Sequence, residues 1–258
     1  MIPEPDVTVL ASLPRRPLGG LPVIAASPLV AADAAINSAQ MLPSEGAAVH
    51  LINAYSVALA QKDPLFREAL SGSAYNFPDG KPLSWVTRMT QQPLSQVRGP
   101  QFFLDVIDRG RVSGVRHFLL GGSEDLLVKL QQKLESRFPD ADIVGTFSPP
   151  FRPLSPAELD AQDEAIRRSG AQIVWVGLGT PKQDHEVRRL SASLQVTACA
   201  VGAAFDFTAG TKREAPKWMT RAGLEWVFRL LSEPRRLWKR YLIGNFVFLA
   251  AVVRNRRT

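Results

Sequence analysis

One carboxylate of the sequence stands in a setting that could support catalysis. In the stretch YNFPDGKPLSW, Asp79 lies between a proline and a glycine, with apolar and aromatic residues close on both sides. A Pro-Asp-Gly sequence is typical of a surface turn, which is one interpretation. Apolar neighbours would also raise the pKa of a carboxylate and suit it to act as a general base at the mouth of a cleft. From these residues alone, both interpretations of Asp79 remain open.

A glycine turn supplies the second candidate site. The sequence IVWVGLGTPKQ leads an apolar strand into Gly177 and Gly179, which allow a tight turn and close approach of the backbone. We expect Thr180 to cap the next helix, with Pro181 at its first position. The N–H groups and the positive end of that helix would then favour a phosphate, although an ordinary strand-to-helix turn is the alternative. Lys182 stands where the dinucleotide fingerprint G-x-G-x-x-G needs a glycine.

A third candidate follows the last apolar strand. In VGAAFDFTAGTKR, Gly202 and the small residues after it let a ligand approach the backbone, and Asp206 lies among aromatic residues. Its carboxylate could accept hydrogen bonds from a base or a sugar. It could equally cap a helix or form an ion pair with Lys212 or Arg213, and the sequence does not decide between these roles.

The sequence offers no metal site. Cys199 is the only cysteine, which excludes an internal disulfide and a cysteine-based metal cluster. The three histidines do not have the spacing of metal ligands, and we interpret His185 as an ordinary polar-face residue. The DAD sequence at residues 140–142 follows a proline and is interpreted as a turn.

These candidates lie in a chain whose pattern predicts a Rossmann-like α/β domain. Between residues 47 and 201, short apolar runs alternate with segments of helical periodicity, which implies a mostly parallel sheet with helices on both faces. We assign this catalytic domain to residues 21–211 and expect the first 20 residues to be poorly ordered. The expected strands cover 47–53, 115–122, 141–147, 171–179 and 195–202.

Basic charge is concentrated near the C-terminus. The chain of 258 residues has a net charge of +7, and residues 212–258 hold 12 lysines and arginines against three glutamates, a balance of +9. The first 211 residues therefore carry −2. A polyanion, a phosphate-bearing ligand or an anionic membrane should meet the protein at this segment.

The same segment predicts a helical appendage. We expect one helix from about residue 215 to 233 and a second that begins at Pro234. The apolar run at 241–253 has 13 residues, too few to span a membrane. Because basic residues flank it, we favour a helix lying on an anionic membrane surface, with a core or oligomer-interface helix as the alternative.

Three stretches together resemble the bacterial WecG/TagA/CpsF family of glycosyltransferases. They are FPDGKPLSWVTR at 77–88, VWVGLGTPKQ at 174–183, and the long stretch at 201–242 that includes EWVFRLLSEPRRLWKRYL. RGPQFFLDV and HFLLGG are also similar to that family. The resemblance covers roughly residues 45–245.

The resemblance implies an inverting transfer from a nucleotide-sugar, usually a UDP-sugar, to a polyprenyl-diphosphate-linked acceptor of a cell-surface polysaccharide. It implies no metal or other cofactor, a cytoplasmic location at the inner face of the plasma membrane, and an appendage that helps to complete the site. We expect no nucleic-acid partner, and a homo-oligomer is plausible because the tail is apolar. The donor sugar, the acceptor saccharide and the final polysaccharide stay open.

The resemblance also suggests roles for individual residues. Asp79 matches the catalytic base of the family, and Asn53 matches an asparagine at the end of the first strand. Leu51 stands where the family commonly has threonine, which puts the sugar specificity in doubt. The remaining positions expected to bind substrate are Gly177, Gly179, Thr180, Lys182, Gln183, Gly202, Asp206, Arg229, Arg236 and Lys239.

Two other functions are considered. An NAD(P)-dependent oxidoreductase can have the same fold, but the chain lacks the glycine fingerprint and the acidic residue about 20 positions after it. A membrane- or nucleic-acid-binding module without catalysis would use the basic tail. Its aromatic residues follow helical spacing with leucines, which suits packing better than nucleic-acid binding.

Overall fold

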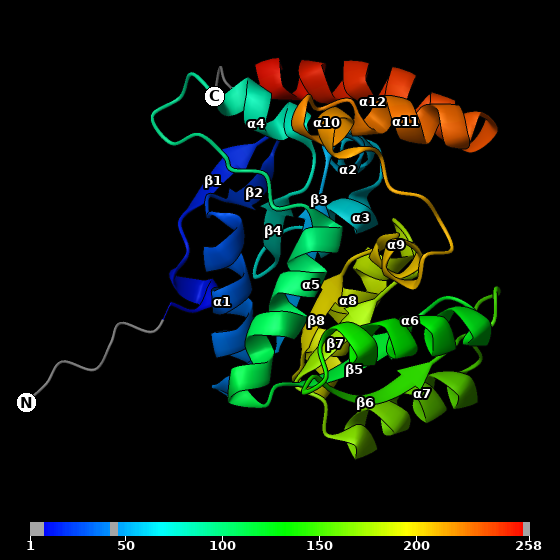
Figure 1. Ribbon diagram of the computed structural model, residues 1–258. Helices are drawn as coiled ribbons and strands as arrows, with labels where there is room; N and C mark the ends of the chain where they lie inside the picture. Colours follow the sequence, from blue (N-terminus) through cyan, green and yellow to red (C-terminus); the bar gives the residue numbers. More distant parts are fainter. Residues whose placement is uncertain (1–7, 42–45, 255–258) are drawn as a thin grey trace, which may run out of the picture.

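The computed structural model describes residues 8–41 and 46–254. Its centre is a six-stranded sheet in which every neighbouring pair of strands is parallel. Figure 1 shows the sheet with helices packed on both of its faces, so the predicted Rossmann-like α/β fold is confirmed. The strand order is β4 (Tyr75–Pro78), β3 (Ala47–Ile52), β8 (Thr197–Ala200), β7 (Ile173–Val176), β5 (Arg116–Leu120) and β6 (Asp142–Phe147).

Two hydrophobic clusters hold helices against the two faces of this sheet. The larger cluster packs Phe103 of α5 against Trp175 of β7, with the ring centroids 4.9 Å apart. The second packs Val187 of α8 against Val174 of β7. Because both faces are covered, the central strand β7 is apolar and buried throughout. The first face carries α1 (Pro28–Gln40), α5 (Gly99–Gly110), α6 (Glu124–Arg137) and α9 (Ala204–Ala209), and the second carries α7 (Pro156–Ser169) and α8 (Lys182–Leu194).

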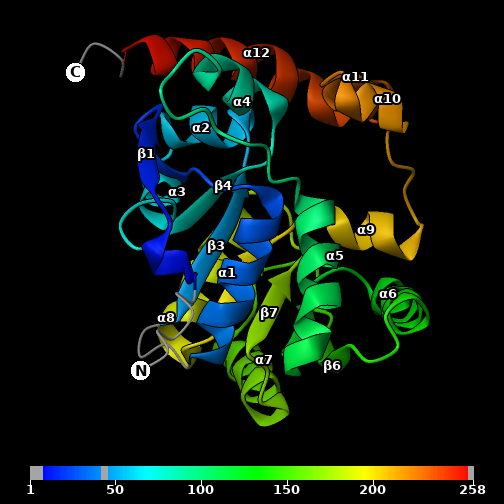
Figure 2. The same ribbon diagram turned by 60° about the vertical axis from the view of Figure 1, so that its left-hand side comes forward.

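The N-terminal region contains elements that the apolar pattern did not predict. Strands β1 (Arg15–Leu18) and β2 (Leu21–Ile24) form an antiparallel hairpin, and Ser27 caps α1 with a hydrogen bond from the N–H of Val30. The first 20 residues were expected to be poorly ordered, but β1 lies among them. Residues 1–7 lie outside the described residues. Figure 2 shows the hairpin beside the β4 edge of the fold.

The appendage consists of three helices, α10 (Lys217–Arg221), α11 (Glu225–Ser232) and α12 (Pro234–Arg254). The start of α12 at Pro234 agrees with the prediction, whereas the expected single helix before it is broken at Gly223, whose φ is +75°. A Cβ at this glycine would lie 2.4 Å from the ring of Trp85, so the break also lets the chain pass close to the helix beneath it.

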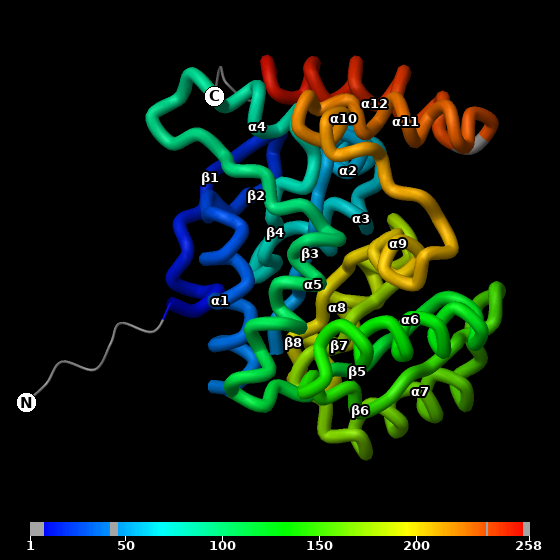
Figure 3. The backbone as a smooth tube through the Cα atoms, in the orientation of Figure 1, coloured from blue at the N-terminus to red at the C-terminus, as the bar shows by residue number. Residues whose placement is uncertain are grey.

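Helix α12 closes over the start of the domain. Figure 3 traces the chain from α9 through an extended stretch to α10 and back over α2 (Ala54–Ala60) and α4 (Lys81–Thr87). Phe248 and Val252 of α12 are buried in one cluster with Leu21 of β2, Val57 of α2 and Phe66 of α3 (Pro64–Ala69). The appendage therefore shares a hydrophobic core with the N-terminal hairpin. Two short 3₁₀ turns, Leu10–Ser12 and Arg111–Ser113, complete the described elements.

Candidate active site

Asp79 directly follows strand β4 at the carboxyl edge of the sheet. Its backbone N–H donates to the carbonyl of Ile52 over 2.7 Å, and its carbonyl accepts from the side-chain amide of Gln96 over 2.5 Å. Its carboxylate accepts the N–H of Gly99, at the start of α5, over 2.8 Å. Because hydrogen bonds from the end of β3 and from the segment around the start of α5 fix its position, Asp79 does not lie in a loose surface turn.

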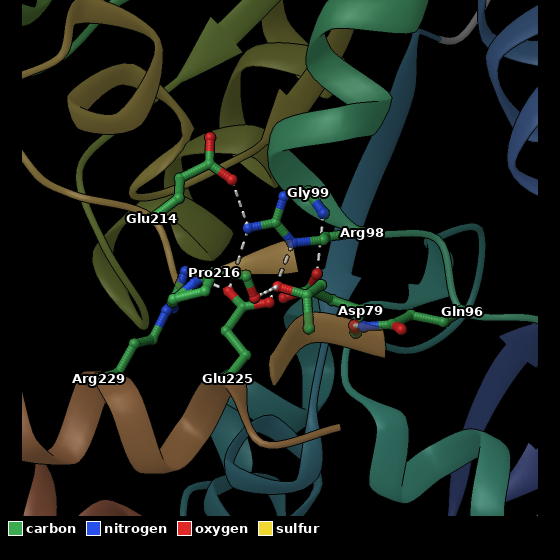
Figure 4. Close-up of polar contacts among 9 residues, drawn as sticks. Asp79, Gln96, Arg98, Gly99, Glu214, Pro216, Glu225 and Arg229 are labelled. Atoms are coloured by element: carbon green, nitrogen blue, oxygen red, sulfur yellow. Dashed lines mark hydrogen bonds and ion pairs between the residues drawn. The ribbon is translucent and has the colours of Figure 1, made fainter. Parts of the chain in front are cut away.

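Charged groups of the appendage surround this carboxylate (Figure 4). Burial raises the pKa of Asp79 above the usual range of an aspartate, and the neighbouring carboxylate of Glu225 raises it further. The N–H of Gly99 and the positive charges of Arg229 and Arg98 oppose this effect, but the net direction is upward. A carboxyl group with a raised pKa holds a proton more strongly, which is the property that a general base needs.

An ion-pair network ties the appendage to the segment before α5. Arg98 contacts Glu225 over 3.0 Å and Glu214 over 2.7 Å, and Arg229 contacts Glu225 over 3.2 Å. Arg98 and Glu225 are 17% and 19% exposed, so this pair is largely shielded from water, whereas Glu214 is 42% exposed. Sequence reasoning missed Arg98 and Glu225, because partners 127 positions apart leave no local pattern.

Asp79 and the glycine turn line the same cleft, which has a volume of about 550 Å³. This cleft lies at the carboxyl ends of β3, β4, β7 and β8, where open α/β sheets bind ligands. The appendage forms its other wall. Of the predicted site residues, the cleft brings together Asn53, Asp79, Gly179, Thr180, Gln183, Gly202 and Arg229, and it also contains Leu51.

A second cleft, of about 740 Å³, adjoins the first along Gly179 and Gly202. The predicted residues Gly177, Lys182 and Asp206 line this one. Asp206 accepts a hydrogen bond from the hydroxyl of Thr211 and forms an ion pair with Lys212 over 3.4 Å. Asp206 therefore has an ion-pair partner in Lys212, and its binding of a substrate stays a prediction.

The glycine turn is built differently from the prediction. The residue that precedes α8 is Pro181, and the expected side-chain cap by Thr180 is wrong. Instead, the N–H of Gly179 donates to the side-chain carbonyl of Gln183 over 3.0 Å. The N–H of Gln183 donates to the carbonyl of Gly179, and the N–H groups of Asp184 and His185 donate to the carbonyl of Pro181. Because these four N–H groups already have partners, they are not the ones that would bind a phosphate in the cleft.

Asn53 is a helix cap as well as a cleft residue. Its side-chain oxygen accepts the N–H groups of Tyr55 and Ser56, which fixes the start of α2. The side-chain NH₂ group of Asn53 thereby keeps a fixed orientation at the cleft.

The basic residues predicted on the appendage divide between two places. Arg229 lines the Asp79 cleft and stacks over the ring of Phe207 at 5.0 Å. Lys239 lines a separate groove between α2 and α12. The side chain of Arg236 lies outside the described residues. Sequence reasoning also missed Arg240, which lines both the cleft and the groove and stacks over the ring of Tyr55 at 4.5 Å.

Neither a membrane span nor a metal cluster is found among residues 8–41 and 46–254. Within these ranges no helix combines the length and apolarity that crossing a membrane requires. Nor do three or more His, Cys, Asp or Glu side chains gather there in a way that could hold a metal ion. Independence from metal stays a prediction.

Comparison with known families identifies the family of the chain. The model of the glycosyl transferase WecG/TagA/CpsF family matches residues 17–258, which include most of the hairpin, the sheet, the Asp79 cleft and the appendage. A match of this length covers nearly the whole chain. The chain therefore belongs to the WecG/TagA/CpsF family of glycosyltransferases.

Proposed function

We propose that the protein is an inverting glycosyltransferase that moves a sugar from a UDP-sugar to a polyprenyl-diphosphate-linked acceptor, in the synthesis of a cell-surface polysaccharide. The family supports glycosyl transfer with a nucleotide-sugar donor and an acceptor. The observation that carries the mechanism is the position of Asp79, which lines one cleft with the glycine turn and with the cationic Arg229.

Asp79 acts as the general base in this proposal. The acceptor hydroxyl oxygen forms a bond to the anomeric carbon while the bond from that carbon to the diphosphate oxygen breaks. The hydroxyl proton passes to Asp79, and the electron pair of the breaking bond leaves on the nucleoside diphosphate. Because attack occurs opposite the leaving group, the anomeric configuration inverts. A positioned general base contributes a factor of about 10²–10⁴ in rate.

Cationic side chains stabilise the departing diphosphate. Arg229, Arg240, Lys212 and Arg213 all line the Asp79 cleft. Arginine is well suited to this role because its planar group donates two parallel hydrogen bonds to a phosphate and stays charged at all relevant pH values. Negative charge that develops on the leaving group in a partly enclosed cleft is stabilised more strongly there than in water.

The two adjoining clefts suggest how the donor lies. The sugar and diphosphate occupy the 550 Å³ cleft, and the nucleoside extends past Gly179 and Gly202 into the 740 Å³ cleft. Gln183 positions the turn between them, because its side chain bonds the N–H of Gly179 and lies against Gly202, where a Cβ would come within 3.4 Å of its oxygen.

The outer face of α12 supports peripheral association with a membrane. Large apolar side chains at spacings of three and four form an exposed row on this helix, with Phe246 75% exposed. Arg235, Lys239 and Arg254 lie near the two ends of the row. An apolar helical face with basic neighbours is the arrangement of helices that lie in the interface of an anionic bilayer. The row consists of Trp238, Leu242, Phe246, Leu249 and Val253.

A donor screen tests the proposed function. The full chain is incubated with individual UDP-sugars and a short-chain polyprenyl-diphosphate-linked saccharide, and the product is analysed by mass spectrometry and by NMR of the new anomeric bond. We expect one sugar to be added with inverted configuration. Retention of configuration, or hydrolysis of every donor without transfer, would contradict the proposal.

A further inference from the structure

A buried polar pair lies directly beneath the Asp79 cleft. His50 on β3 and Asp184 in the first turn of α8 are 0% and 4% exposed, and Nδ1 of His50 lies 2.9 Å from Oδ1 of Asp184. Because a carboxylate accepts and does not donate, Nδ1 of His50 carries the hydrogen of this bond. His50 is in register with Ala200, the last residue of β8, which lines the cleft. The pair therefore joins a strand to a helix at the level where the cleft begins.

The pair interrupts an apolar contact between β3 and α8. Further from the cleft, Ala48 of β3 packs with Val187 and Leu190 of α8 in one hydrophobic cluster. Side chains alternate along a strand, so His50 lies on the same face of β3 as Ala48. Asp184 likewise lies one helical turn before Val187, on the same face of α8. Apolar residues at both places would extend this contact, and such replacements of buried charged pairs are often neutral or stabilising. Stability alone therefore does not explain the pair.

The pair leaves polar atoms unsatisfied. Nε2 of His50 and Oδ2 of Asp184 are buried and have no hydrogen-bond partner within residues 8–41 and 46–254. Unpaired polar atoms in a core are unfavourable, which again argues against a purely stabilising role. The one bond that the pair does form is directional, because it requires a particular placement of the first turn of α8 on β3. Apolar contacts alone do not impose such a placement.

Each member of the pair is the chain neighbour of a cleft residue. Asp184 follows Gln183, whose side-chain oxygen accepts the N–H of Gly179 over 3.0 Å. His50 precedes Leu51, which lines the cleft. A shift of the first turn of α8 relative to β3 would carry Gln183 away from the glycine turn, so the geometry of that turn depends on the pair.

We propose that the His50–Asp184 pair positions Gln183, and through it the glycine turn, for the nucleotide-sugar donor. This inference rests on the proposed function, because it takes the donor to bind at Gly179. Neither His50 nor Asp184 is among the described residues that line the two clefts, so both are positioning residues and not catalytic ones.

The double variant His50→Leu/Asp184→Leu tests this inference. It keeps an apolar contact between β3 and α8 and removes the bond, so Tm should be unchanged or higher. Amide hydrogen exchange at Gly179, followed by NMR, should become at least about tenfold faster, because Gln183 no longer holds the turn in place. The Kd for UDP, measured by calorimetry, should rise by about tenfold. Wild-type exchange at Gly179, or wild-type UDP affinity, in the folded variant would refute the proposal. If the double variant does not fold, Asp184→Ala removes the same bond and is judged by the same two measurements.

Asp184→Asn is the conservative variant. Its side-chain oxygen can still accept the Nδ1–H of His50, so Gly179 exchange and UDP affinity should stay within about twofold of the wild type. A loss as large as that in the double variant would show that the hydrogen bond is not what positions the turn, and would overturn the assignment.

His117 provides a matched control on the same sheet. It is a buried histidine of β5 with one side-chain bond, from Nε1 of Trp175 over 3.2 Å. It is in register with Ile173, the first residue of β7, and so lies at the edge of the sheet opposite the cleft. His117→Leu should lower Tm but leave Gly179 exchange and UDP affinity as in the wild type. If it weakens UDP binding as much as the double variant does, the effect is a general loosening of the sheet and the proposal fails.

Kinetics separate this inference from the proposed function. In the double variant, KM for the donor should rise by about tenfold while KM for the acceptor stays within about twofold of the wild type. An equal rise in both would refute the positioning role. If the wild type transfers sugar but the variant matches it, only this inference fails. If Gly179 exchange responds as expected but the wild type neither binds UDP nor transfers sugar, the pair still positions the turn and the proposed function fails.

Discussion

Replacing Glu225 by glutamine tests whether the appendage controls the protonation of Asp79. The Glu225 carboxylate, after burial, is the second cause of the raised pKa of Asp79. Its removal also leaves the positive charges of Arg98 and Arg229 less neutralised, and both of these favour the charged form of Asp79. Both effects act in the same direction, so the pKa of Asp79 should fall in Glu225→Gln.

The sign of the expected change in rate follows from the role of the base. Only the deprotonated form of Asp79 can accept the hydroxyl proton, so kcat/KM falls as the pH drops through its pKa. A lower pKa therefore moves the acid limb of the kcat/KM profile to lower pH. Burial remains in the variant, so the limb should stay above the usual aspartate range.

Glu214→Gln is the matched control. It removes the other carboxylate on Arg98, and Glu214 is not among the groups that shift the pKa of Asp79. Glu225→Gln removes the shielded ion pair with Arg98 and should reduce the free energy of unfolding by about 1–3 kcal/mol. This loss lies between those expected for a buried and for a surface ion pair. Loss of the more exposed Glu214 contact should cost about 1 kcal/mol or less.

The assay is kcat/KM for transfer as a function of pH, with thermal unfolding measured in parallel. We expect the acid limb to move to lower pH in Glu225→Gln and to move much less in Glu214→Gln, which removes only a partner of Arg98. A limb that moves equally in both variants, or moves to higher pH in Glu225→Gln, would refute the reasoning about Asp79.

Three further predictions concern stability and membrane binding. Asp79→Asn should leave the free energy of unfolding at pH 7.5 unchanged or higher, because folding disfavours the carboxylate above its raised pKa. The difference between the variant and the wild type should vanish at a pH below the usual aspartate range, where Asp79 is protonated in both the folded and the unfolded state. A lower Tm of the variant at pH 7.5 would contradict this prediction. Gly223→Ala should lower the free energy of unfolding by about 2 kcal/mol or more, because the added Cβ clashes with Trp85. Gly72→Ala is the control: its φ is +62° but the space around it is open, so it should show only the backbone strain of about 1–2 kcal/mol. Equal losses of the two variants in calorimetry would be inconsistent with the clash. Phe246→Ser should weaken sedimentation with anionic vesicles by about tenfold or more without changing Tm, since a buried phenylalanine contributes about 1.5–3 kcal/mol, and unchanged sedimentation would argue against the α12 row as the membrane contact.

The central sheet is predictable from sequence because its signals are local. Strands β3, β5, β6, β7 and β8 were predicted from their apolar runs, whereas β4, which contains Asn76 and ends at Pro78, was missed. Ser155 caps α7 with the proline after it, and Gly170 ends the helix in the left-handed conformation. The hairpin before α1 was missed because prolines and glycines interrupt its strands, and such residues ordinarily mark loops.

The candidate site was predictable only in part. Asp79 and the glycine turn are recognisable motifs, but that both line one cleft depends on how the strands pair in the sheet. Arg98 and Glu225 could not be found because their pairing depends on how the appendage folds back. Thr180 was expected to cap α8 from its residue type alone, but Gln183 supplies the bond to the turn from within the helix.

The most direct test of the central claim is the turnover of Asp79→Asn at saturating donor and acceptor, together with UDP binding. Asparagine keeps the shape of the side chain and an oxygen that can accept the N–H of Gly99, but it cannot take up the proton of a hydroxyl. We predict that kcat falls by about 10²–10⁴-fold, or about 3–5 kcal/mol, while the Kd for UDP stays within about twofold of the wild type. Wild-type kcat in the folded variant would contradict the assignment of Asp79 as the base.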